Sequence, residues 1–209
     1  MKLGIIIPTY NSLNTLKVLI KNIQDYTENY NLYVVEDGQK KETIDWLKEN
    51  KINSIFNKKN KGVAGSWNVG LKKAIEDNCT HFAILNDDIE LPAKWWEECK
   101  KAFDNKRVHL AFLDAPSPIT ITGWFFIIDK YCVDKVGYFD EDFYPYYAED
   151  DDYFIRYKQA GLRYMQIGID VFHHGSHTIE KLDKKKSEGI RKSNLNKLVA
   201  KHDHIRRQA

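Results

Sequence analysis

Two groups of acidic residues are the strongest candidates for chemistry in this 209-residue chain. Asp87 and Asp88 directly follow the apolar run 81–85, which is predicted to be a buried strand. Two carboxylates at a strand end repel each other unless a cation lies near them, and hard divalent ions prefer such oxygen ligands. The pair therefore predicts a metal that would bridge to a diphosphate leaving group. A solvated turn with an aspartate cap for the next helix explains the pair equally well.

The second group is Glu149-Asp150-Asp151-Asp152, which is predicted to open a helix over about 149–160. A helix dipole favours acids at this place, but four adjacent acids exceed what capping needs. We interpret at least one of them as a general base that the helix terminus holds over a pocket. Because successive helical side chains point about 100° apart, at most two of the four can share a site.

A cluster of histidines, His173, His174 and His177, follows the strand-like residues 163–172. A histidine at a strand end could ligate a metal or contact a phosphate. A surface histidine, or one satisfied inside the core, explains any single member equally well.

The elements that would position these residues alternate between strand and helix over the first hundred residues. In chain order they are a strand at 3–8, a helix at 13–25, a strand at 32–36, a helix at 41–50, a strand at 52–56, a helix at 66–75, a strand at 81–85 and a helix starting at Pro92. Four such alternations predict an α/β fold with a mainly parallel central sheet flanked by helices. Further strands are expected at about 108–113 and 122–128.

Ligands bind at the carboxyl ends of the strands in an open α/β sheet. Three predicted strands end there in polar residues, namely Pro8-Thr9-Tyr10-Asn11, Glu36-Asp37-Gly38 and Asn86-Asp87-Asp88. The phosphate-binding patterns GxxxxGK(S/T) and GxGxxG are both absent from the sequence. Their absence argues against Walker ATPases and Rossmann dinucleotide enzymes.

Charge is unevenly distributed, although the net charge is only +2. Residues 178–209 hold ten Lys or Arg against four Asp or Glu, whereas residues 1–177 hold 22 against 26. We predict one α/β domain over 1–177 and a basic helical extension over 178–209. The extension either packs through an apolar side or contacts an anionic surface, such as nucleic acid, a phosphorylated acceptor or a membrane. The residues of that apolar side would be Leu195, Leu198, Val199 and Ile205.

The cysteines, the apolar runs and the first residues of the sequence bear on the cellular compartment. Its three cysteines are odd in number and far apart, which supports neither a zinc site nor a disulfide framework. No apolar run approaches the roughly 20 residues needed to cross a bilayer, and the first residues do not resemble a signal peptide. We expect a cytoplasmic protein, either free or at the periphery of a membrane.

A series of motifs spread over nearly all of residues 3–177 resembles the GT-A glycosyltransferases of family 2, the large inverting group, and in particular its rhamnosyltransferase-like members. The matching segments are IIIPTYN at 5–11, VVEDG at 34–38, NKGVAGSWN at 60–68, LNDDIE at 85–90, GWFF at 123–126, VGYFDE at 136–141, EDDD at 149–152 with Arg156, and HHGS at 173–176. Two of them depart from the family pattern. Glu36 stands where an aspartate is usual, and Asn86-Asp87-Asp88 stands where the family has Asp-x-Asp.

This resemblance implies transfer of a hexose or deoxyhexose from a UDP-, GDP- or dTDP-sugar to an acceptor hydroxyl with inversion, assisted by Mn²⁺ or Mg²⁺. It implies that Asp150 is the catalytic base, with Glu149 and Asp152 in reserve. Asp88 would bind the metal, and His174 would complete the metal or diphosphate site. The implied nucleotide-binding residues are Pro8, Thr9, Tyr10, Asn11, Glu36, Asp37, Asn60, Gly62, Asn68 and Asp87. Trp124 and Tyr147 would stack on sugar faces, or else lie in the core.

The sequence leaves the acceptor open among saccharides, lipid-linked molecules, nucleic acid and protein. It also leaves three other classes of protein open. A nucleotidyltransferase would share the sheet, the acids and the metal, but it would carry a Gly-rich basic phosphate loop where this chain has Pro8-Thr9-Tyr10-Asn11. A non-catalytic sugar or nucleotide binder would keep the fold and lose the base. A nucleic-acid-binding module is favoured only by the basic extension.

Overall fold

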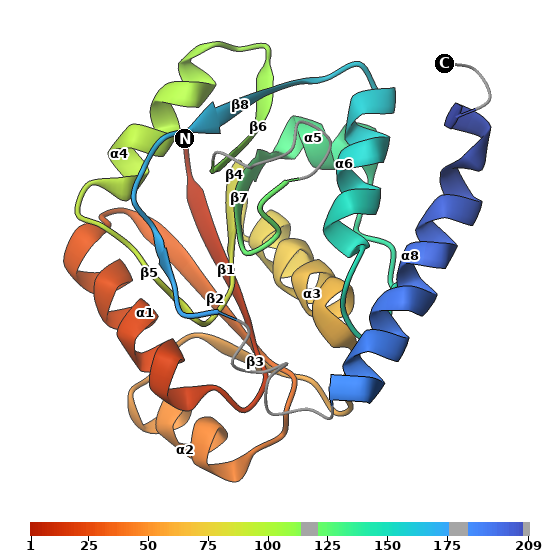
Figure 1. The fold of residues 1–209 in the computed structure, drawn as a ribbon. Coiled ribbons are helices and arrows are strands. Elements are labelled where there is room, and N and C mark those ends of the chain that lie inside the picture. Colours follow the sequence, from red (N-terminus) through yellow and green to blue (C-terminus); the bar gives the residue numbers. More distant parts are fainter. Residues whose placement is uncertain (114–120, 176–183, 207–209) are drawn as a thin grey trace.

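A sheet of seven strands lies at the centre of the described part of the chain, which comprises residues 1–113, 121–175 and 184–206 of the computed structural model (Figure 1). The strand order is β3–β2–β1–β4–β7–β6–β8. Only β7 runs antiparallel to its neighbours β4 and β6; the other pairs of this sheet are parallel. The mainly parallel α/β sheet predicted from the sequence is therefore confirmed. The strands are β1 (Leu3–Thr9), β2 (Tyr30–Glu36), β3 (Ser54–Phe56), β4 (His81–Leu85), β6 (Val108–Leu113), β7 (Phe125–Asp129) and β8 (Arg163–Ile167).

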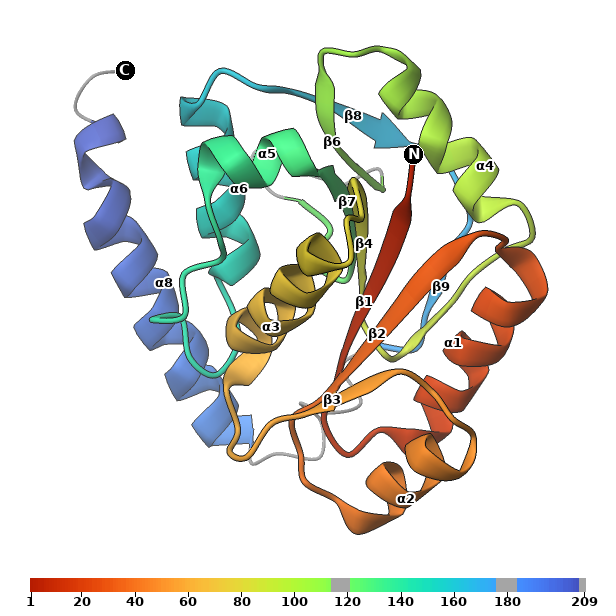
Figure 2. The same ribbon diagram turned by 180° about the vertical axis from the view of Figure 1, so that it is seen from behind.

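Helices cover both faces of the sheet (Figures 1 and 2). One face carries α1 (Leu13–Tyr26), α2 (Lys41–Glu49) and α4 (Trp95–Lys100), which continues as a 3-10 turn over Lys101–Asp104. The other carries α3 (Gly62–Glu76), α5 (Lys130–Val136) and α6 (Glu149–Gln159). The sequence predicts α1, α2 and α6 to within a residue or two. It starts α3 too late and α4 too early, and it does not predict α5.

Two apolar layers attach these helices to the sheet. In β1, Ile5 and Ile7 belong to the layer beneath α1, whereas Ile6 belongs to the layer beneath α3. Neighbouring residues of a strand point to opposite faces, and here both faces are covered, so β1 is a continuous apolar run. Part of the high aromatic content lies in the second layer, where the ring of Trp67 packs 5.5 Å from that of Phe126.

The carboxyl ends of β1, β2 and β4 meet at one edge of the sheet. The backbone N–H of Asp37 donates to the carbonyl of Thr9 at 2.9 Å, which ties the ends of β1 and β2 together. Just beyond β4, the two-residue strands β5 (Ile89–Glu90) and β9 (Phe172–His173) pair antiparallel. This small sheet brings the histidine motif beside Asp87-Asp88.

The last described helix, α8 (Lys184–Arg206), lies alongside α6 in both ribbon views (Figures 1 and 2). Two residues of the apolar side expected for it, Leu195 and Val199, do not pack inward, because they are 38% and 44% exposed, whereas Leu198 is half-buried. A polar side faces the protein instead: Asn194 is only 1% exposed, and its amide donates to the carbonyl of Tyr146 at 2.9 Å. The side chain of Ile205 lies outside the described residues, as do Ser176 and His177.

The three cysteines, Cys79, Cys99 and Cys132, are buried and free of disulfides. Among the described helices, none has the length and apolar character needed to cross a membrane.

Candidate active site

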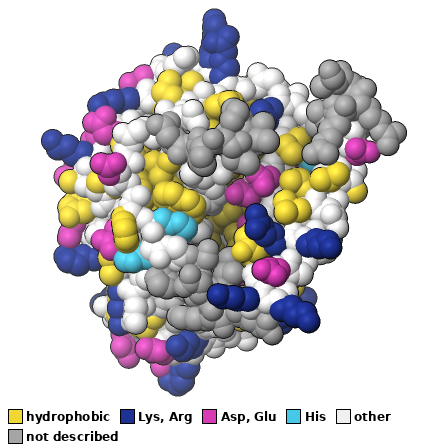
Figure 3. All heavy atoms as spheres, viewed as in Figure 1, with side chains coloured by type: hydrophobic (Ala, Val, Ile, Leu, Met, Phe, Trp, Pro, Cys, Tyr) yellow, Lys and Arg dark blue, Asp and Glu magenta, His cyan; other side chains and the backbone are white. Residues whose placement is uncertain are grey.

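A cavity of about 670 Å³ opens at the carboxyl ends of β1, β2 and β4. It appears as a hollow near the middle of the face shown in Figure 3, with histidines on one side and Lys and Arg over the first half of α8 on the other. Twelve of the residues proposed from the sequence line it. They are Pro8, Thr9, Tyr10, Asp37, Asn60, Gly62, Asp87, Asp88, Trp124, Tyr147, Glu149 and Asp150.

One wall holds buried polar atoms that have no hydrogen-bond partner among the described residues. These are Oδ1 of Asp88, Oδ2 of Asp87 and Nε2 of His173. Nε2 of His173 lies 3.2 Å from Oδ1 of Asp88, so a carboxylate oxygen and an imidazole nitrogen converge on one point. Burial, together with the nearby charge of Asp88, raises the pKa of Asp87 to about 7, although a hydrogen bond with Thr9 opposes the shift. Buried polar groups without hydrogen bonds are unfavourable, so these atoms could serve as ligand-binding groups.

The histidine that reaches the cavity is His173 and not His174. His173 is the last residue of β9 and pairs with Ile89, and it lines the cavity. His174 lies outside the cavity wall, with its Nε2 2.7 Å from a carboxylate oxygen of Glu90. Successive residues of an extended segment point in opposite directions, so only one of two adjacent histidines can face the cavity. The sequence motif does not reveal which one.

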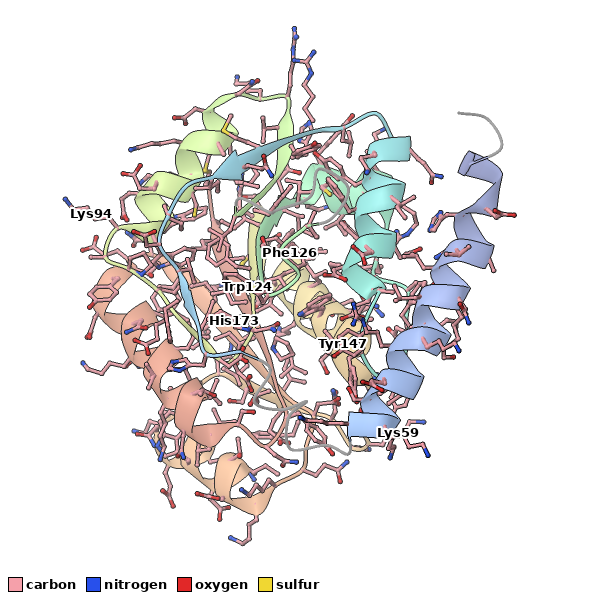
Figure 4. All side chains as sticks on the ribbon, in the orientation of Figure 1. Lys59, Lys94, Trp124, Phe126, Tyr147 and His173 are labelled. Atoms are coloured by element: carbon pink, nitrogen blue, oxygen red, sulfur yellow. The ribbon has the colours of Figure 1, made fainter. Side chains whose placement is uncertain are left out.

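Trp124 holds His173 in place. Its ring stacks on the imidazole, with centroids 4.7 Å apart and an angle of 15° between the planes (Figure 4). One face of Trp124 is therefore already occupied by protein. A sugar could stack only on the part of the ring that remains open to the cavity.

The opposite wall carries the acids that open α6. Tyr147 and Ala148 just before them both have positive φ, at 76° and 74°, which turns the chain so that Glu149 and Asp150 face the cavity. The carboxylate of Asp150 lies directly on Gly123, where an added Cβ would be 2.0 Å from Oδ2. A side chain of any size at that position would push the carboxylate away.

The electrostatics of this acid pair favour proton transfer near neutral pH. Burial and the charge of Asp151 raise the pKa of Asp150 to about 7, against hydrogen bonds from backbone N–H groups. Burial and the charge of Asp150 also raise the pKa of Glu149 well above its ordinary value. Two adjacent buried carboxylates disfavour each other's ionisation. A carboxylate with a pKa near the working pH is well suited to accept a proton.

Asp152 is directed away from the cavity and does not line it. Its Oδ2 accepts a hydrogen bond from Nε of Arg156 at 2.8 Å, and its Oδ1 lies 2.8 Å from Nε2 of His202 and 2.7 Å from Nζ of Lys201. The side chain therefore joins α6 to α8. As the helical spacing requires, two of the four acids share the site and Asp152 lies on another side.

The nucleotide side proposed from the sequence is only partly assembled around the cavity. Asp37 lines it, but the Asp37 carboxylate accepts hydrogen bonds from the backbone N–H groups of Lys61 and Gly62 and from the amide of Asn57. An acid at the start of α3 is stabilised by the helix dipole. In this structure the carboxylate of Asp37 fixes the beginning of α3 at the cavity wall.

Three other proposed nucleotide residues do not line the cavity. Glu36 is fully buried, and its carboxylate accepts the backbone N–H groups of Gly38 and Gln39. The amide of Asn68 donates to the carbonyl of Phe139 at 2.9 Å and accepts from its N–H at 2.9 Å, which ties α3 to the segment after α5. Asn11 adopts a positive φ of 58° next to Gly38. These residues shape the loops around the cavity.

Several lining residues were not singled out as site residues by the sequence. Lys186 and Ile190 of α8 line the cavity, and they come from a segment far away in sequence whose position depends on packing. Trp67 also lines it, and its indole N–H has no partner among the described residues. The remaining ones include Tyr144, Pro145 and Tyr146. The sequence shows that this stretch is rich in aromatic residues, but it does not predict that these three line the cavity.

The arrangement of this sheet, with an acidic cavity at the carboxyl ends of its strands, is the GT-A type of fold. A mannosyltransferase from Pyrobaculum calidifontis, solved in complex with GDP-Man and Mn²⁺, matches it with a TM-score of 0.74 and 16% identity, over 97% of this chain and 64% of that one. The sequence profile of glycosyl transferase family 2 matches residues 4–174. The chain belongs to glycosyl transferase family 2, as its motifs suggested.

Curated relatives are similar over part of the chain. An uncharacterized glycosyltransferase of Rickettsia bellii is 33% identical over 108 residues, which are 46% of this chain and 15% of the relative. A UDP-N-acetylglucosamine–dolichyl-phosphate N-acetylglucosaminyltransferase of Methanococcus voltae is 36% identical over 90 residues, 34% of this chain and 35% of the relative. The aligned part is thus about a third or less of each relative's length.

Proposed function

We propose that this chain transfers a sugar from a nucleotide-sugar donor to an acceptor hydroxyl, with inversion at the anomeric carbon. The observation that carries the proposal is the position of Asp150. Its carboxylate, with a pKa raised to about 7, lines the same cavity as Asp88 and His173, whose facing oxygen and nitrogen atoms lie 3.2 Å apart. A base on one wall and a diphosphate site on the other would leave the sugar between them.

In this proposal Asp150 accepts the proton of the acceptor hydroxyl. The oxygen forms a bond to C1 of the donor sugar as the bond from C1 to the diphosphate oxygen breaks, and the nucleoside diphosphate leaves with the electron pair. A positioned base contributes roughly 10²–10⁴-fold to such a step. Glu149 adjoins the base in the cavity, whereas Asp152 lies outside it, so we keep only Glu149 as a reserve base.

Oδ1 of Asp88 and Nε2 of His173, which lie 3.2 Å apart and have no hydrogen-bond partner among the described residues, fit a divalent metal. Within the described residues no group of three or more His, Cys, Asp or Glu side chains could hold one. Mg²⁺ and similar ions, however, often take one or two protein ligands and complete their shell with substrate phosphates and water. We therefore assign the metal to Asp88 and His173, in place of His174. Bound there, Mn²⁺ or Mg²⁺ would stabilise the charge of the leaving diphosphate.

The donor is proposed as a UDP-, GDP- or dTDP-sugar, with the nucleoside near Pro8, Thr9, Tyr10 and Asp37. The names of similar proteins give a starting order for a test. The Methanococcus voltae relative is named for UDP-N-acetylglucosamine, and the Pyrobaculum calidifontis enzyme was solved with GDP-Man. UDP-GlcNAc and GDP-Man are therefore the first donors to examine.

The test is donor hydrolysis and transfer with a panel of nucleotide sugars, each with and without Mn²⁺, followed by analysis of the anomeric configuration of the product. Thermal shift with the matching nucleoside diphosphates comes first, because a ligand at 100 times its Kd adds about 2.7 kcal/mol of stability. Retention of configuration would contradict the single displacement. Binding of nucleotide without any turnover would indicate a non-catalytic binder.

A further inference from the structure

Two aromatic side chains of the cavity wall carry buried polar groups that the described residues leave without a hydrogen-bond partner. They are the indole N–H of Trp67 and the hydroxyl of Tyr146. We call these two residues the aromatic pair. The proposed base and the proposed metal residues include neither of them. Because buried polar groups in native proteins are nearly always paired, each of the two is a candidate contact for a bound molecule.

The indole of Trp67 is held in place by packing. Its ring centroid lies 5.5 Å from that of Phe126, in an edge-on arrangement, and 4.8 Å from that of Phe139. The side chain is only 1% exposed. A ring enclosed in this way has one orientation, so the fold fixes where its N–H lies. An indole N–H donates and cannot accept, so its partner must carry an acceptor atom such as an oxygen.

The backbone of Tyr146 is also held. Its carbonyl accepts the amide of Asn194 from α8 at 2.9 Å, and its ring packs against that of Tyr147 with centroids 5.1 Å apart. A phenol hydroxyl can donate or accept a hydrogen bond. The aromatic pair therefore offers one obligate donor and one group that serves in either sense.

The two residues come from elements that touch. The backbone N–H of Val63, in the first turn of α3, donates to the carbonyl of Pro145 at 2.9 Å, which joins α3 to the turn that contains Tyr146. Trp67 follows Val63 by four residues, so the two lie on the same side of α3, one turn apart. All four of these residues line the cavity.

The aromatic pair lies between the two functions assigned to the cavity. Trp67 is on α3, whose start is held by the carboxylate of Asp37 on the proposed nucleotide side. Tyr146 is in the turn that leads into α6 and the proposed base, Asp150. A ligand group in contact with both residues lies between the nucleotide and the base. In a single displacement the transferred sugar occupies that place, because it is bonded to the nucleoside diphosphate and is attacked by the acceptor oxygen that the base deprotonates.

We propose that the indole N–H of Trp67 and the hydroxyl of Tyr146 form hydrogen bonds with hydroxyl groups of the transferred sugar, and so select among donor sugars. Both groups are uncharged, as sugar hydroxyls are. A hydroxyl oxygen can accept from the indole, and a hydroxyl proton can be donated to the phenol oxygen. A buried site that pairs with a substrate hydroxyl discriminates strongly against a substrate that lacks it, because the protein groups then stay unpaired. This proposal rests on the proposed function, because it takes the donor to be a nucleotide sugar.

The test separates the sugar from the nucleotide. UDP-GlcNAc and GDP-Man are titrated by calorimetry with Mg²⁺ against wild type, Trp67→Phe and Tyr146→Phe, and UDP and GDP are titrated in the same way. A further replacement, Trp67→β-(3-benzothienyl)alanine, keeps two fused rings and exchanges the N–H for sulfur, so it separates the hydrogen bond from the packing.

Trp95→Phe is the matched control. Trp95 is as deeply buried as Trp67, but it packs on the opposite face of the sheet and does not line the cavity. Its indole N–H donates to Oγ1 of Thr27 at 2.8 Å. Trp95→Phe should therefore lower Tm, because the hydroxyl of Thr27 loses its donor, and should bind every nucleotide as wild type does.

We expect each variant of the aromatic pair to bind the better of the two sugar nucleotides about three- to tenfold more weakly than wild type, which is the range for one neutral hydrogen bond. The affinity for UDP or GDP alone should not change. Deoxy analogues of that donor then identify the contact. The analogue that lacks the bound hydroxyl should bind equally weakly to wild type and to the variant, because both changes remove the same hydrogen bond.

Three results would overturn the proposal. Equal weakening of the sugar nucleotide and of the free nucleoside diphosphate would mean that the pair shapes the nucleotide site. Unchanged donor affinity with a raised KM for the acceptor would mean that the pair binds acceptor hydroxyls. Wild-type donor affinity in the benzothienyl variant would mean that the indole serves packing alone. If no nucleotide sugar binds to wild type, the proposed function itself fails, and that result is distinct from these three.

Discussion

Replacing Asp152 with alanine should destabilise the protein by about 3 kcal/mol. The carboxylate is fully buried and lies against Arg156, Lys201 and His202 at 2.7–2.8 Å. Removing one partner of a buried ionic cluster costs about 3–5 kcal/mol, because the remaining charges stay behind unpaired. Arg156 and Lys201 keep partial access to water, so we expect the lower end of that range. For a chain of this size, such a loss lowers Tm by about 6–12 °C.

The pH dependence of this loss has a definite sign. Burial by itself would raise the pKa of Asp152, but hydrogen bonds from Lys201, His202 and Arg156 lower it below its ordinary value. A carboxyl group whose pKa is lowered by folding contributes its stability above its unfolded pKa of about 3.9, and that contribution is lost as pH falls through the folded pKa. The difference in Tm between wild type and Asp152→Ala should therefore be full at pH 7 and shrink below about pH 4.

The assay is thermal unfolding followed by circular dichroism at neutral and acidic pH, with Asp151→Ala as the matched control. Asp151 is the preceding residue of α6, and burial raises its pKa, so its removal should leave Tm within a degree or two or increase it slightly. Asp152→Ala and His202→Ala both remove the same contact. The double variant should therefore lose less stability than the sum of the losses in the two single variants. A loss of under about 1 kcal/mol in Asp152→Ala, or additive losses in the double variant, would refute the ionic link between α6 and α8.

Three further predictions concern the cavity. Asp150→Asn should lower the rate of transfer by about 10²-fold or more while nucleotide affinity stays the same. The rate of transfer by wild type should rise through about pH 7 as the Asp150 carboxylate ionises. Near-normal turnover in the variant would move the base to Glu149. His173→Ala should abolish the Mn²⁺ dependence of nucleotide binding measured by calorimetry, whereas His174→Ala should retain it; the reverse pattern would restore His174 as the metal residue. Gly123→Ala should reduce kcat and leave nucleotide affinity unchanged. The Cβ of the new alanine would lie 2.0 Å from Oδ2 of Asp150 and displace the carboxylate. An unchanged kcat would show that the carboxylate does not need that position.

The sequence predicts the frame of the site well, because the frame depends on local signals. The apolar run ending at Pro8 and the run 81–85 predict two strands of a parallel sheet, and in the structure these strands pair and their polar ends meet at the cavity. The acids before Tyr153 predict the start of α6 at Glu149. These signals are short, strongly patterned and independent of distant partners.

The direction of individual side chains could not be predicted from the same signals. Asn68 lies in a glycosyltransferase-like motif, but its amide is engaged by the backbone of Phe139, 71 residues away. His173 and His174 differ only in which side of a two-residue strand they occupy. In both cases the deciding contact comes from a segment far away in the sequence, so no local pattern contains it.

The apolar residues Leu195 and Val199 of the basic extension are exposed for the same reason. The sequence of α8 offers a weak apolar side, and the expectation that Leu195 and Val199 pack inward follows from hydrophobicity alone. The segment it meets, 140–152, instead presents carbonyl groups and carboxylates, so a side with Asn194, Lys201 and His202 is the complementary one. Once α8 is held by that polar side, its first turns are fixed at the cavity mouth. The residues that pack, Asn194, Lys201 and His202, are therefore different from the residues of the same helix that line the cavity, Lys186 and Ile190.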